Sequence, residues 1–455
     1  MDKSGPTRRN FIPGAAAVFT ILPRHVLGGP GYTPPSDKLN IGAIGVGGMG
    51  KSYIAGCSSE NIAAIADVDD VLAAPVRAKY PSATSYRDFR TMLEKERGID
   101  AVIIGTPDHS HAAIAMAAIQ LGKAVYCAKP MTRTVHEART VAKAARQAKV
   151  ATQMSVQSCA SDEACSTEEW IQAGVVGQVR EVHVWTDRPV WPQGLARPLG
   201  NFAVPGSLDW DLWLGPAPER PYNPLYHPFN FRGWYDFGSG ALGDMGCHTF
   251  HVIVRALDLG SPVSVSADRT FQRVFSPEQK PDPSWTRSVV ASTPETFPAS
   301  SIVTWDFAAR GTNPPVRMLW YEGGLKPPRP AGMAPEDQLG PDGILFIGEK
   351  GILASGFTGG PRLLGERSHK DFTPPSKSLP RTIGHYREWI EACKGGKPAS
   401  CNFDFGSQLT EICQLGVSAQ RSAKYLAYDA PTMRFSNDAD ANQYLTEQYR
   451  SGWSL

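Results

Sequence analysis

Short, uninterrupted runs of apolar residues alternate with helical patterns along the first third of the chain. The apolar runs lie at residues 39–44, 61–66, 101–104 and 124–127. Apolar residues spaced three and four apart mark helices over residues 51–57, 71–79, 86–96, 112–121 and 135–149. Runs without polar alternation are typical of strands that are buried on both faces. This succession predicts a doubly wound parallel sheet with right-handed crossovers over residues 36–155.

The pattern changes after about Met154, where aromatic and β-branched residues begin to alternate with polar ones. Strands with this period-two pattern are expected over residues 179–186, 263–272, 301–307, 316–322 and 344–347. Such strands form antiparallel sheets that carry helices on one face. We expect residues 156–455 to form an α+β domain with a large, mostly antiparallel open sheet.

A glycine-rich turn joins the first strand to the first helix. Gly45, Gly47 and Gly50 form G-x-G-x-x-G, in which the glycines permit a tight turn, close approach of a pyrophosphate, and close packing of the helix. Asp67 follows the second strand, 22 positions after Gly45, where a dinucleotide-binding fold needs a carboxylate for the ribose 2′-hydroxyl. The chain is therefore predicted to begin with a Rossmann domain.

The predicted cofactor is NAD. The residues after Asp67 are Val68, Asp69 and Asp70, and none of them is an arginine or lysine that could accept the 2′-phosphate of NADP. NADP is the less favoured alternative. Two further residues of the turn, Gly48 and Met49, are expected to contact the dinucleotide.

Lys129 is the first candidate for reaction chemistry. It follows the apolar run 124–127 and precedes Pro130, which places it at the carboxyl edge of the parallel sheet, where such folds bind ligands. Next to nicotinamide and partly desolvated, it is expected to have a pKa shifted towards a range useful for proton transfer. The alternative is a solvated surface lysine.

A second candidate group follows the glycine-rich segment 237–240. If residues 240–251 are helical, Asp244 and His248 share one face at i and i+4, and a carboxylate that orients an imidazole is a recurring general-base arrangement. His251 lies on the same stripe, so the three residues could instead form a two-histidine, one-carboxylate metal site. A buried structural histidine is the third possibility, and we predict no metal.

The segment 189–237 is crowded with Trp, Pro, Tyr and Arg. Long loops of this composition commonly form binding sites, and sugars stack their C–H faces on aromatic rings while arginine binds their hydroxyls. For Trp210 and Trp213 we expect simple packing instead. The residues predicted to bind substrate are Arg188, Trp191, Tyr226, Arg232 and Trp234.

With these motifs, the chain resembles the glucose-fructose oxidoreductase, inositol dehydrogenase and rhizopine-catabolism (Gfo/Idh/MocA) family. The resemblance rests on the glycine turn 45–50, the loop 106–111 (TPDHSH), the pair Lys129-Pro130, and residues 240–248, which match G-x-x-x-D-x-x-x-H. It covers nearly the whole chain after the N-terminal segment.

The resemblance implies roles for these residues. Lys129 and His248 would be the acid/base pair, with Asp244 beside them, in an NAD(P)-dependent homo-oligomer associating through the open sheet face. The loop 106–111 would lie near nicotinamide, with cofactor contacts from Thr106, Pro107, His109 and His111. Where the family has E-K-P, this chain has Ala128 before the lysine, which removes a negative charge from beside the lysine and the cofactor.

Composition narrows the class of partner. The 46 basic and 44 acidic residues leave a formal net charge of +2, and the absence of basic runs argues against nucleic acid or an anionic membrane as partner. A small carbohydrate remains the expected partner. The eight cysteines show no C-x-x-C, so neither a disulfide framework nor a zinc finger is predicted. A length of 455 residues favours two domains.

The N-terminus resembles a twin-arginine export signal. Arg8 and Arg9 precede a small-residue apolar run at 14–22, which is too short to span a bilayer. Residues 1–35 are therefore expected to be a signal and linker, and the protein to be periplasmic or otherwise exported. A disordered basic tail and an uncleaved anchor are the alternatives.

The expected function is oxidation of a sugar or polyol CH–OH group, with the hydride passed to tightly bound NAD. Because an exported enzyme has no obvious pool of free NAD, the cofactor would be recycled in place. One alternative is an NAD-dependent glycoside hydrolase that oxidises, eliminates and re-reduces, which needs a second base such as His227, Tyr226 or His111. Another is a carbohydrate-binding protein without catalysis.

Overall fold

The computed structural model describes residues 34, 37–198, 200, 202–271, 295–330, 333–336, 338–365 and 372–455. By its contacts the chain divides into two units, Met1–Lys38 and Leu39–Leu455. Apart from Pro34, the predicted signal and linker lie outside the described residues. In the described part of the chain, no helix is long and apolar enough to cross a membrane.

The first sheet has six strands in the order β3-β2-β1-β4-β5-β6, and every pair in it is parallel. Its strands are β1 (Asn40–Ile44), β2 (Asn61–Ala66), β3 (Thr84–Tyr86), β4 (Ala101–Ile104), β5 (Ala124–Cys127) and β6 (Thr152–Met154). This is the strand order of a dinucleotide-binding fold. The predicted doubly wound sheet is confirmed.

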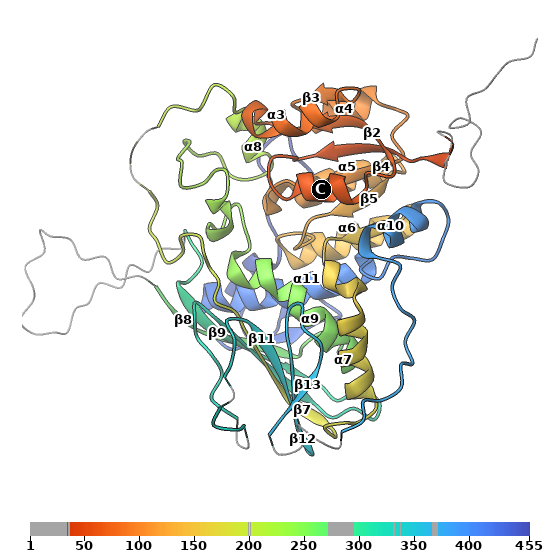
Figure 1. Ribbon diagram of the computed structural model, residues 1–455. Coiled ribbons are helices and arrows are strands. Elements are labelled where there is room, and N and C mark those ends of the chain that lie inside the picture. The colour runs from red at the N-terminus through yellow and green to blue at the C-terminus, as the bar shows by residue number, and fades with distance from the viewer. Residues whose placement is uncertain are drawn as a thin grey trace, which may run out of the picture. The chain divides into compact units, whose positions relative to one another are not determined.

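Helices cover both faces of this sheet, as Figure 1 shows. They are α2 (Gly50–Gly56), α3 (Asp70–Lys79), α4 (Phe89–Lys95), α5 (His111–Gln120) and α6 (Val135–Ala148). Asp69 and Asp88 accept backbone hydrogen bonds at the starts of α3 and α4, and Thr134 with Glu137 forms a capping box on α6. The helix predicted from residue 86 begins at Phe89, because the three-residue strand β3 precedes it and lacks an apolar run that would reveal it.

The second sheet has nine strands in the order β13-β12-β11-β7-β10-β9-β8-β14-β15. Only the pair β7 and β10 is parallel, so the prediction of a mostly antiparallel sheet is confirmed. The strands are β7 (Val179–Trp185), β8 (Ser264–Thr270), β9 (Ser300–Phe307), β10 (Val316–Glu322), β11 (Gly343–Gly348), β12 (Gly351–Ser355), β13 (Arg362–Leu364), β14 (Leu426–Asp429) and β15 (Arg434–Phe435).

Two long helices, α9 (Gly240–Ala256) and α11 (Phe403–Ser422), lie between the two sheets (Figure 1). Phe250 of α9 packs edge-on against Trp305 and Trp320 of the second sheet, and the Trp305 indole N–H donates to the carbonyl of Ile412 in α11. The remaining helices are α7 (Asp162–Gln172), α8 (Trp210–Leu214) and α10 (His385–Cys393).

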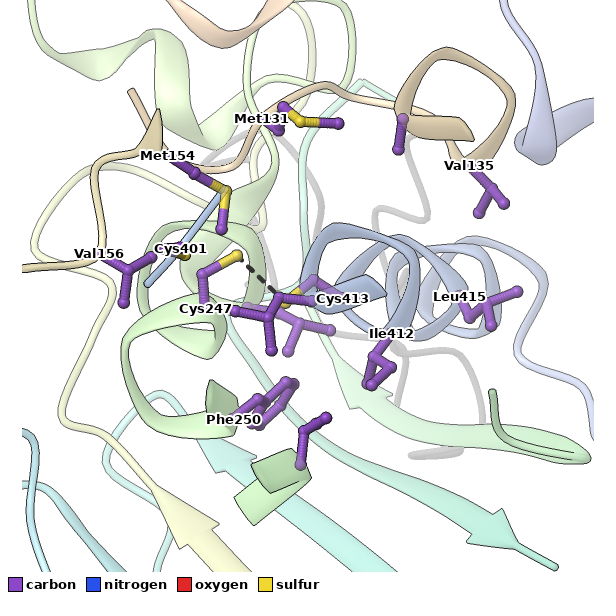
Figure 2. Close-up of a cluster of buried hydrophobic side chains, with 14 of the residues drawn as sticks. Met131, Val135, Met154, Val156, Cys247, Phe250, Cys401, Ile412, Cys413 and Leu415 are labelled. Atoms are coloured by element: carbon purple, nitrogen blue, oxygen red, sulfur yellow. Dashed lines mark hydrogen bonds between the residues drawn. The ribbon is translucent and has the colours of Figure 1, made fainter. Parts of the chain in front are cut away.

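Sulfur-containing side chains fill the junction between α9, α11 and the first sheet. Figure 2 shows Met131, Met154, Cys247, Cys401 and Cys413 gathered there, all without exposed surface. The sulfur atoms of Cys247 and Cys413 lie 3.8 Å apart, and both residues are free thiols. Polarisable, adaptable side chains suit an irregular junction of this kind. The boundary proposed near residue 155 stays a prediction, because Leu39–Leu455 forms one contact unit.

The C-terminal tail packs onto the rest of the chain. Ala441 and Leu445, in a short 3₁₀ helix (Asp440–Leu445), are buried. Farther on, the Tyr449 hydroxyl donates to Glu137 of α6, and the Trp453 ring lies 6.1 Å from that of Phe89 in α4. The tail therefore connects α11 to the first domain.

A buried carboxylate, Glu322 at the end of β10, supports the start of α9. It has no exposed surface, and it accepts hydrogen bonds from Trp320 Nε1 at 3.0 Å, Ser301 Oγ at 2.8 Å and Gln420 Nε2 at 2.7 Å. The backbone N–H of Leu242, in the first turn of α9, also stabilises its charged form. Burial outweighs these groups and raises the pKa of Glu322 to about 7.

Replacing Glu322 by Gln is expected to change how stability depends on pH. Because the folded pKa is raised from its usual 4.5, the wild-type contribution is fully present below pH 4.5 and is lost as pH rises towards 7. The loss should amount to about 3 kcal/mol in the free energy of unfolding. Urea unfolding at a series of pH values measures it. Glu322→Gln should flatten this slope, whereas the exposed control Glu94→Gln should keep it. An unchanged slope in Glu322→Gln would show the carboxyl to be ionised throughout.

Candidate active site

The glycine-rich turn follows β1 and leads into α2. Gly45 has φ +75°, and a Cβ added at Gly50 would lie 1.9 Å from the carbonyl oxygen of Gly45, so only glycine fits at both positions. A Cβ added at Gly48 would meet nothing within 4 Å, and Met49 is 52 % exposed. The second half of the turn therefore faces open space that a pyrophosphate can enter.

The second glycine of the motif has a packing role that was not predicted. A Cβ at Gly47 would lie 2.6 Å from Cβ of Leu72 in α3. Gly47 is therefore needed for the packing of α3 against the turn, and its predicted role in the approach of a pyrophosphate stays a prediction.

Asp67 lies beside this turn at the end of β2, where it was predicted. Its Oδ2 accepts from the backbone N–H groups of Val46 at 2.7 Å and Gly47 at 3.1 Å, and its Oδ1 accepts from Asp69 at 3.0 Å. Burial raises the pKa of this carboxyl, although the hydrogen bonds from the three amides act to lower it. A carboxylate can accept about four hydrogen bonds, so one site remains for a ribose hydroxyl. The turn and Asp67 together fit a dinucleotide.

The loop 106–111 lies next to the glycine turn, because Thr106 is the residue that a Cβ at Gly45 would strike. The hydroxyl of Ser110 donates to Thr106 Oγ1 and to the carbonyl of Pro107, which fixes the loop. Thr106 thus lies beside the glycine turn, and the cofactor contacts of Thr106 and Pro107 stay a prediction.

The two histidines of this loop are placed differently from the prediction. His109 is 2 % exposed, and its ring nitrogens face the carbonyls of Phe237 and Trp213; burial lowers its pKa to about 3. Both ring nitrogens of His111 face carbonyls as well, those of Pro130 and Thr106 at 2.9 Å. These side chains hold the backbone together, so neither ring nitrogen is available to a cofactor.

Lys129 follows β5 at the carboxyl edge of the parallel sheet, as predicted, and its side chain is 14 % exposed. Nζ donates to Asp244 Oδ1 at 2.5 Å and to the Asp244 carbonyl at 2.6 Å. Its backbone N–H donates to Ser155 Oγ, and its peptide bond to Pro130 is cis. The surface-lysine alternative is therefore wrong.

Asp244 joins two cations. Besides Lys129, it accepts a hydrogen bond of 3.3 Å from Nε of Arg232. Burial disfavours the charged carboxylate, but Lys129 and Arg232 together outweigh burial and lower its pKa to about 2. Asp244 is therefore ionised at neutral pH, and it ties the first sheet to α9.

His248 lies one turn further along α9 and is 8 % exposed. Burial, followed by the charge of Lys129, lowers its pKa well below the usual value, so the imidazole is neutral at neutral pH. Its ring packs edge-on against Phe357 with centroids 4.7 Å apart. Its buried Nδ1 has no hydrogen-bond partner among the described residues.

The prediction that Asp244 orients His248 is wrong in its details. The Asp244 carboxylate bonds Lys129 and Arg232, and no hydrogen bond joins it to His248 within the described ranges. The i, i+4 spacing put both residues on one face, but it could not reveal that two cations from elsewhere would compete for the carboxylate.

The metal alternative finds no support in the geometry. Within the part of the chain that the structure describes, no group of three or more His, Cys, Asp or Glu side chains could hold a metal ion. His251 is buried behind His248, and its Nδ1 has no partner in that part of the chain.

Of the residues predicted to bind substrate, Arg232 joins the site. Its guanidinium also lies 5.7 Å from the ring of Trp191 and 4.6 Å from that of Phe229. Phe229 is 48 % exposed, so it offers an open aromatic face beside the charged cluster. Phe229 was not predicted, because nothing in the sequence distinguishes it from the other aromatic residues of the insertion 189–237.

The other residues predicted to bind substrate do not present exposed side chains next to this cluster. Trp234 has no exposed surface, Tyr226 is 3 % exposed and Trp191 is 5 % exposed. Tyr226 and Trp234 pack edge-on against each other in a cluster that includes the expected packing residue Trp213. Arg188 pairs with its neighbour Asp187 and makes no described contact with the Lys129 cluster.

One further residue of the site was missed. Asp108 is 8 % exposed, and it lies within electrostatic reach of Arg232, Lys129 and Asp244, while burial raises the pKa of its carboxyl. It stands inside the TPDHSH segment, so that motif was the available signal.

Two family models match the chain. Residues 39–156 match the Gfo/Idh/MocA oxidoreductase family, NAD-binding Rossmann fold, and residues 181–279 match that family's C-terminal alpha/beta domain. These matches confirm the resemblance seen in the sequence, and the first confirms NAD as the cofactor.

Curated relatives are similar over about a fifth of this chain. Inositol 2-dehydrogenase 1 of Saccharopolyspora erythraea is 30 % identical over 100 residues, which is 21 % of this chain and 30 % of the relative. Levoglucosan dehydrogenase of Pseudarthrobacter phenanthrenivorans is 33 % identical over 113 residues, 22 % of this chain and 29 % of the relative. The matched region thus spans about a third of the length of these relatives.

Solved structures are similar over both sheets. The WlbA dehydrogenase from Bordetella pertussis, in complex with NADH and UDP-GlcNAcA, superposes with a TM-score of 0.58 at 17 % identity, covering 86 % of this chain and 99 % of that one. An inositol dehydrogenase homolog from Azotobacter vinelandii, complexed with NADH and myo-inositol, gives 0.54 at 15 % identity, covering 86 % and 98 %. At these identities the likeness establishes the fold.

A double-mutant cycle tests the Lys129–Asp244 pair. Asp244→Asn should lower the free energy of unfolding by about 3 kcal/mol, because it leaves the largely buried ammonium of Lys129 without its anion. Lys129→Met should lower it by less, because Asp244 keeps its hydrogen bond from Arg232. The double variant should lose less than the sum, with a coupling of about 1–3 kcal/mol. Urea unfolding at pH 7 measures all three. The exposed pair Arg180–Glu349 serves as control, with coupling below about 1 kcal/mol. Simple additivity at Lys129 and Asp244 would argue against the pair.

Proposed function

We propose that this chain, whose matched regions are the two domains of a Gfo/Idh/MocA oxidoreductase, is an NAD-dependent enzyme that oxidises a sugar or polyol CH–OH group. The proposal rests on one observation. Lys129, at the carboxyl edge of the parallel sheet, forms an ion pair with Asp244. Asp244 in turn lies one helical turn before His248, which is buried and neutral. A polar cluster of this kind beside a dinucleotide turn suits proton transfer coupled to hydride transfer.

NAD, when bound to the turn and Asp67, supplies the hydride acceptor. His248 is neutral because burial and the charge of Lys129 lower its pKa, so it takes the proton from the substrate hydroxyl. Lys129 and Arg232 place positive charge where the alkoxide develops. Asp244 holds both cations in position, and its low pKa of about 2 keeps it charged throughout the working pH range.

The proposed substrate class is a small pyranose or polyol. The exposed ring of Phe229 beside Arg232 combines an aromatic face with a hydrogen-bond donor, as sugar sites do. The names of the relatives, inositol 2-dehydrogenase and levoglucosan dehydrogenase, support a substrate of this class. A non-catalytic binding protein would have no use for the paired lysine and neutral histidine.

The glycosidase alternative needs a second base, and the three residues considered for this role do not supply one. His111 has both ring nitrogens turned to backbone carbonyls. Tyr226 is buried. His227 lies 3.6 Å from Asp69, at the start of α3. The geometry therefore favours simple oxidation and reduction.

Tight retention of the cofactor is part of the proposal. The insertion that carries α8 packs onto the end of β2, with Asp70 N–H donating to the carbonyl of Ser207 and Asp209 N–H to that of Val68. This contact braces the turn that holds the ribose carboxylate. Retention suits export by the twin-arginine route, proposed from Arg8 and Arg9, because a cofactor loaded before export is then recycled in place.

Replacing Asp67 by Ala should weaken NAD binding by on the order of 1–3 kcal/mol, because a charge-assisted hydrogen bond to the ribose is lost. Titration calorimetry on protein stripped of cofactor measures the change. The control Asp100→Ala removes an aspartate that binds a β1 amide at the opposite end of the sheet, and it should leave the NAD affinity unchanged. Equal affinity in Asp67→Ala would remove Asp67 from the cofactor site.

Replacing His248 by Ala, or Lys129 by Met, should abolish reduction of the bound cofactor while NAD stays bound. Stopped-flow absorbance of reduced nicotinamide in a single turnover, with a panel of polyols and glycosides, is the measurement. His183 is also 8 % exposed but lies in the second sheet, so His183→Ala is the matched control and should retain reduction. Near-wild-type rates in both site variants would reject the assignment. Aglycone release without net NADH would instead favour the glycosidase.

A further inference from the structure

A partly open cavity of about 230 Å³ lies apart from the Lys129 cluster. Its walls come from the start of α6, residues 235–238, α11 and the C-terminal tail at residues 443–448. Neither Lys129, Asp244 nor His248 lines it. Its volume is roughly that of seven or eight water molecules in the liquid, which is enough for a small organic acid or a phosphate with a short carbon chain.

Arg421 of α11 lines this cavity. Its guanidinium carbon lies 4.6 Å from the ring centroid of Tyr235 and 4.3 Å from that of Tyr444. Across the described residues, no carboxylate or carbonyl accepts a hydrogen bond from this guanidinium. Arg421 is therefore a half-buried cation whose N–H groups can serve a ligand in the cavity.

The other charges of the cavity are already paired. Arg133 forms an ion pair with Glu447 and donates to the carbonyl of Tyr235. Asp236 is held by Arg220. The guanidinium of Arg421 is the charged group of the lining that donates no hydrogen bond among the described residues, and burial lowers its pKa. An oxyanion that enters the cavity would accept hydrogen bonds from it.

The remaining walls suit a polar ligand. Gln414, Gln443, Thr446 and Gln448 line the cavity, and amides and hydroxyls of this kind hydrogen-bond hydroxyl and carbonyl oxygens. Gln414 also donates to the carbonyl of Thr132 and to Ser239 Oγ at the start of α9. The side chain of Gln414 thus connects the cavity to α9, the helix that carries Asp244 and His248.

We propose that this cavity is a second ligand site, which binds a small molecule through one carboxylate or phosphate group. The planar guanidinium of Arg421 donates two parallel hydrogen bonds to that group, which is the geometry arginine uses for both oxyanions. The tyrosine rings pack against the guanidinium, and the glutamines bind the polar remainder of the ligand. The site is independent of the proposed oxidation.

The test uses NAD-saturated protein, so that inorganic phosphate cannot bind at the dinucleotide turn. Phosphate and acetate are titrated by calorimetry at pH 7, with sodium chloride holding the ionic strength constant. The wild-type protein should bind one equivalent of at least one of them, and the tighter of the two identifies the ligand class. Absence of saturable binding up to roughly 10 mM, ten times a 1 mM dissociation constant, would overturn the proposal.

Variants at position 421 locate the binding. Arg421→Gln should weaken it at least tenfold, and Arg421→Lys should weaken it several-fold, because the charge stays while the fork is lost. Arg387→Gln, at an exposed position on α10, is the matched control and should bind as the wild type does. Unchanged affinity in Arg421→Gln would place the anion elsewhere and overturn the proposal. If Arg421→Gln does not fold, unchanged affinity in Arg421→Lys decides against it equally.

Discussion

The ion pair between Lys129 and Asp244 is the contact on which the site depends. It joins the carboxyl edge of the parallel sheet to α9, so the two halves of the chain meet at the reacting groups. The two side chains are 14 % and 18 % exposed, so both charges are largely removed from water. The cost of this desolvation offsets most of the attraction between them, so the pair depends on precise geometry and on further hydrogen bonds. Further polar contacts supply that geometry: Ser155 binds the Lys129 backbone, Arg232 binds Asp244, and Glu322 supports the first turn of α9.

This arrangement fits the proposed role of His248 as a base, although the residue lacks a carboxylate partner. A histidine paired with Asp244 would be stabilised as imidazolium, whereas here Lys129 binds the carboxylate, and burial together with the charge of Lys129 keeps the imidazole neutral. The same division of charge leaves Lys129 and Arg232 to stabilise an alkoxide.

Much of the fold was predictable because local patterns determine it. The buried strands of the first sheet, the glycine turn and the position of Asp67 follow from apolar runs and glycine spacing, and Lys129 follows from the strand that precedes it. Strands β3 and β6 were missed, because three-residue strands carry too little periodicity. The pairing of Asp244 with Lys129 and the carbonyls around His109 depend on chain segments more than 100 residues apart, which no local pattern reveals. Composition led to the prediction that the insertion 189–237 binds substrate, which stays a prediction, and only packing distinguishes the exposed Phe229 from its buried aromatic neighbours.

Transfer of a substrate hydride to the bound cofactor is the central claim, and isotope transfer tests it most directly. NAD-bound protein is incubated with perdeuterated glucose or with perdeuterated myo-inositol, and the extracted cofactor is analysed by mass spectrometry. The account predicts one deuterium on the nicotinamide ring after incubation with at least one of the two compounds, and none when His248→Ala is used. A cofactor that stays free of deuterium with a full panel of deuterated sugars and polyols would contradict it.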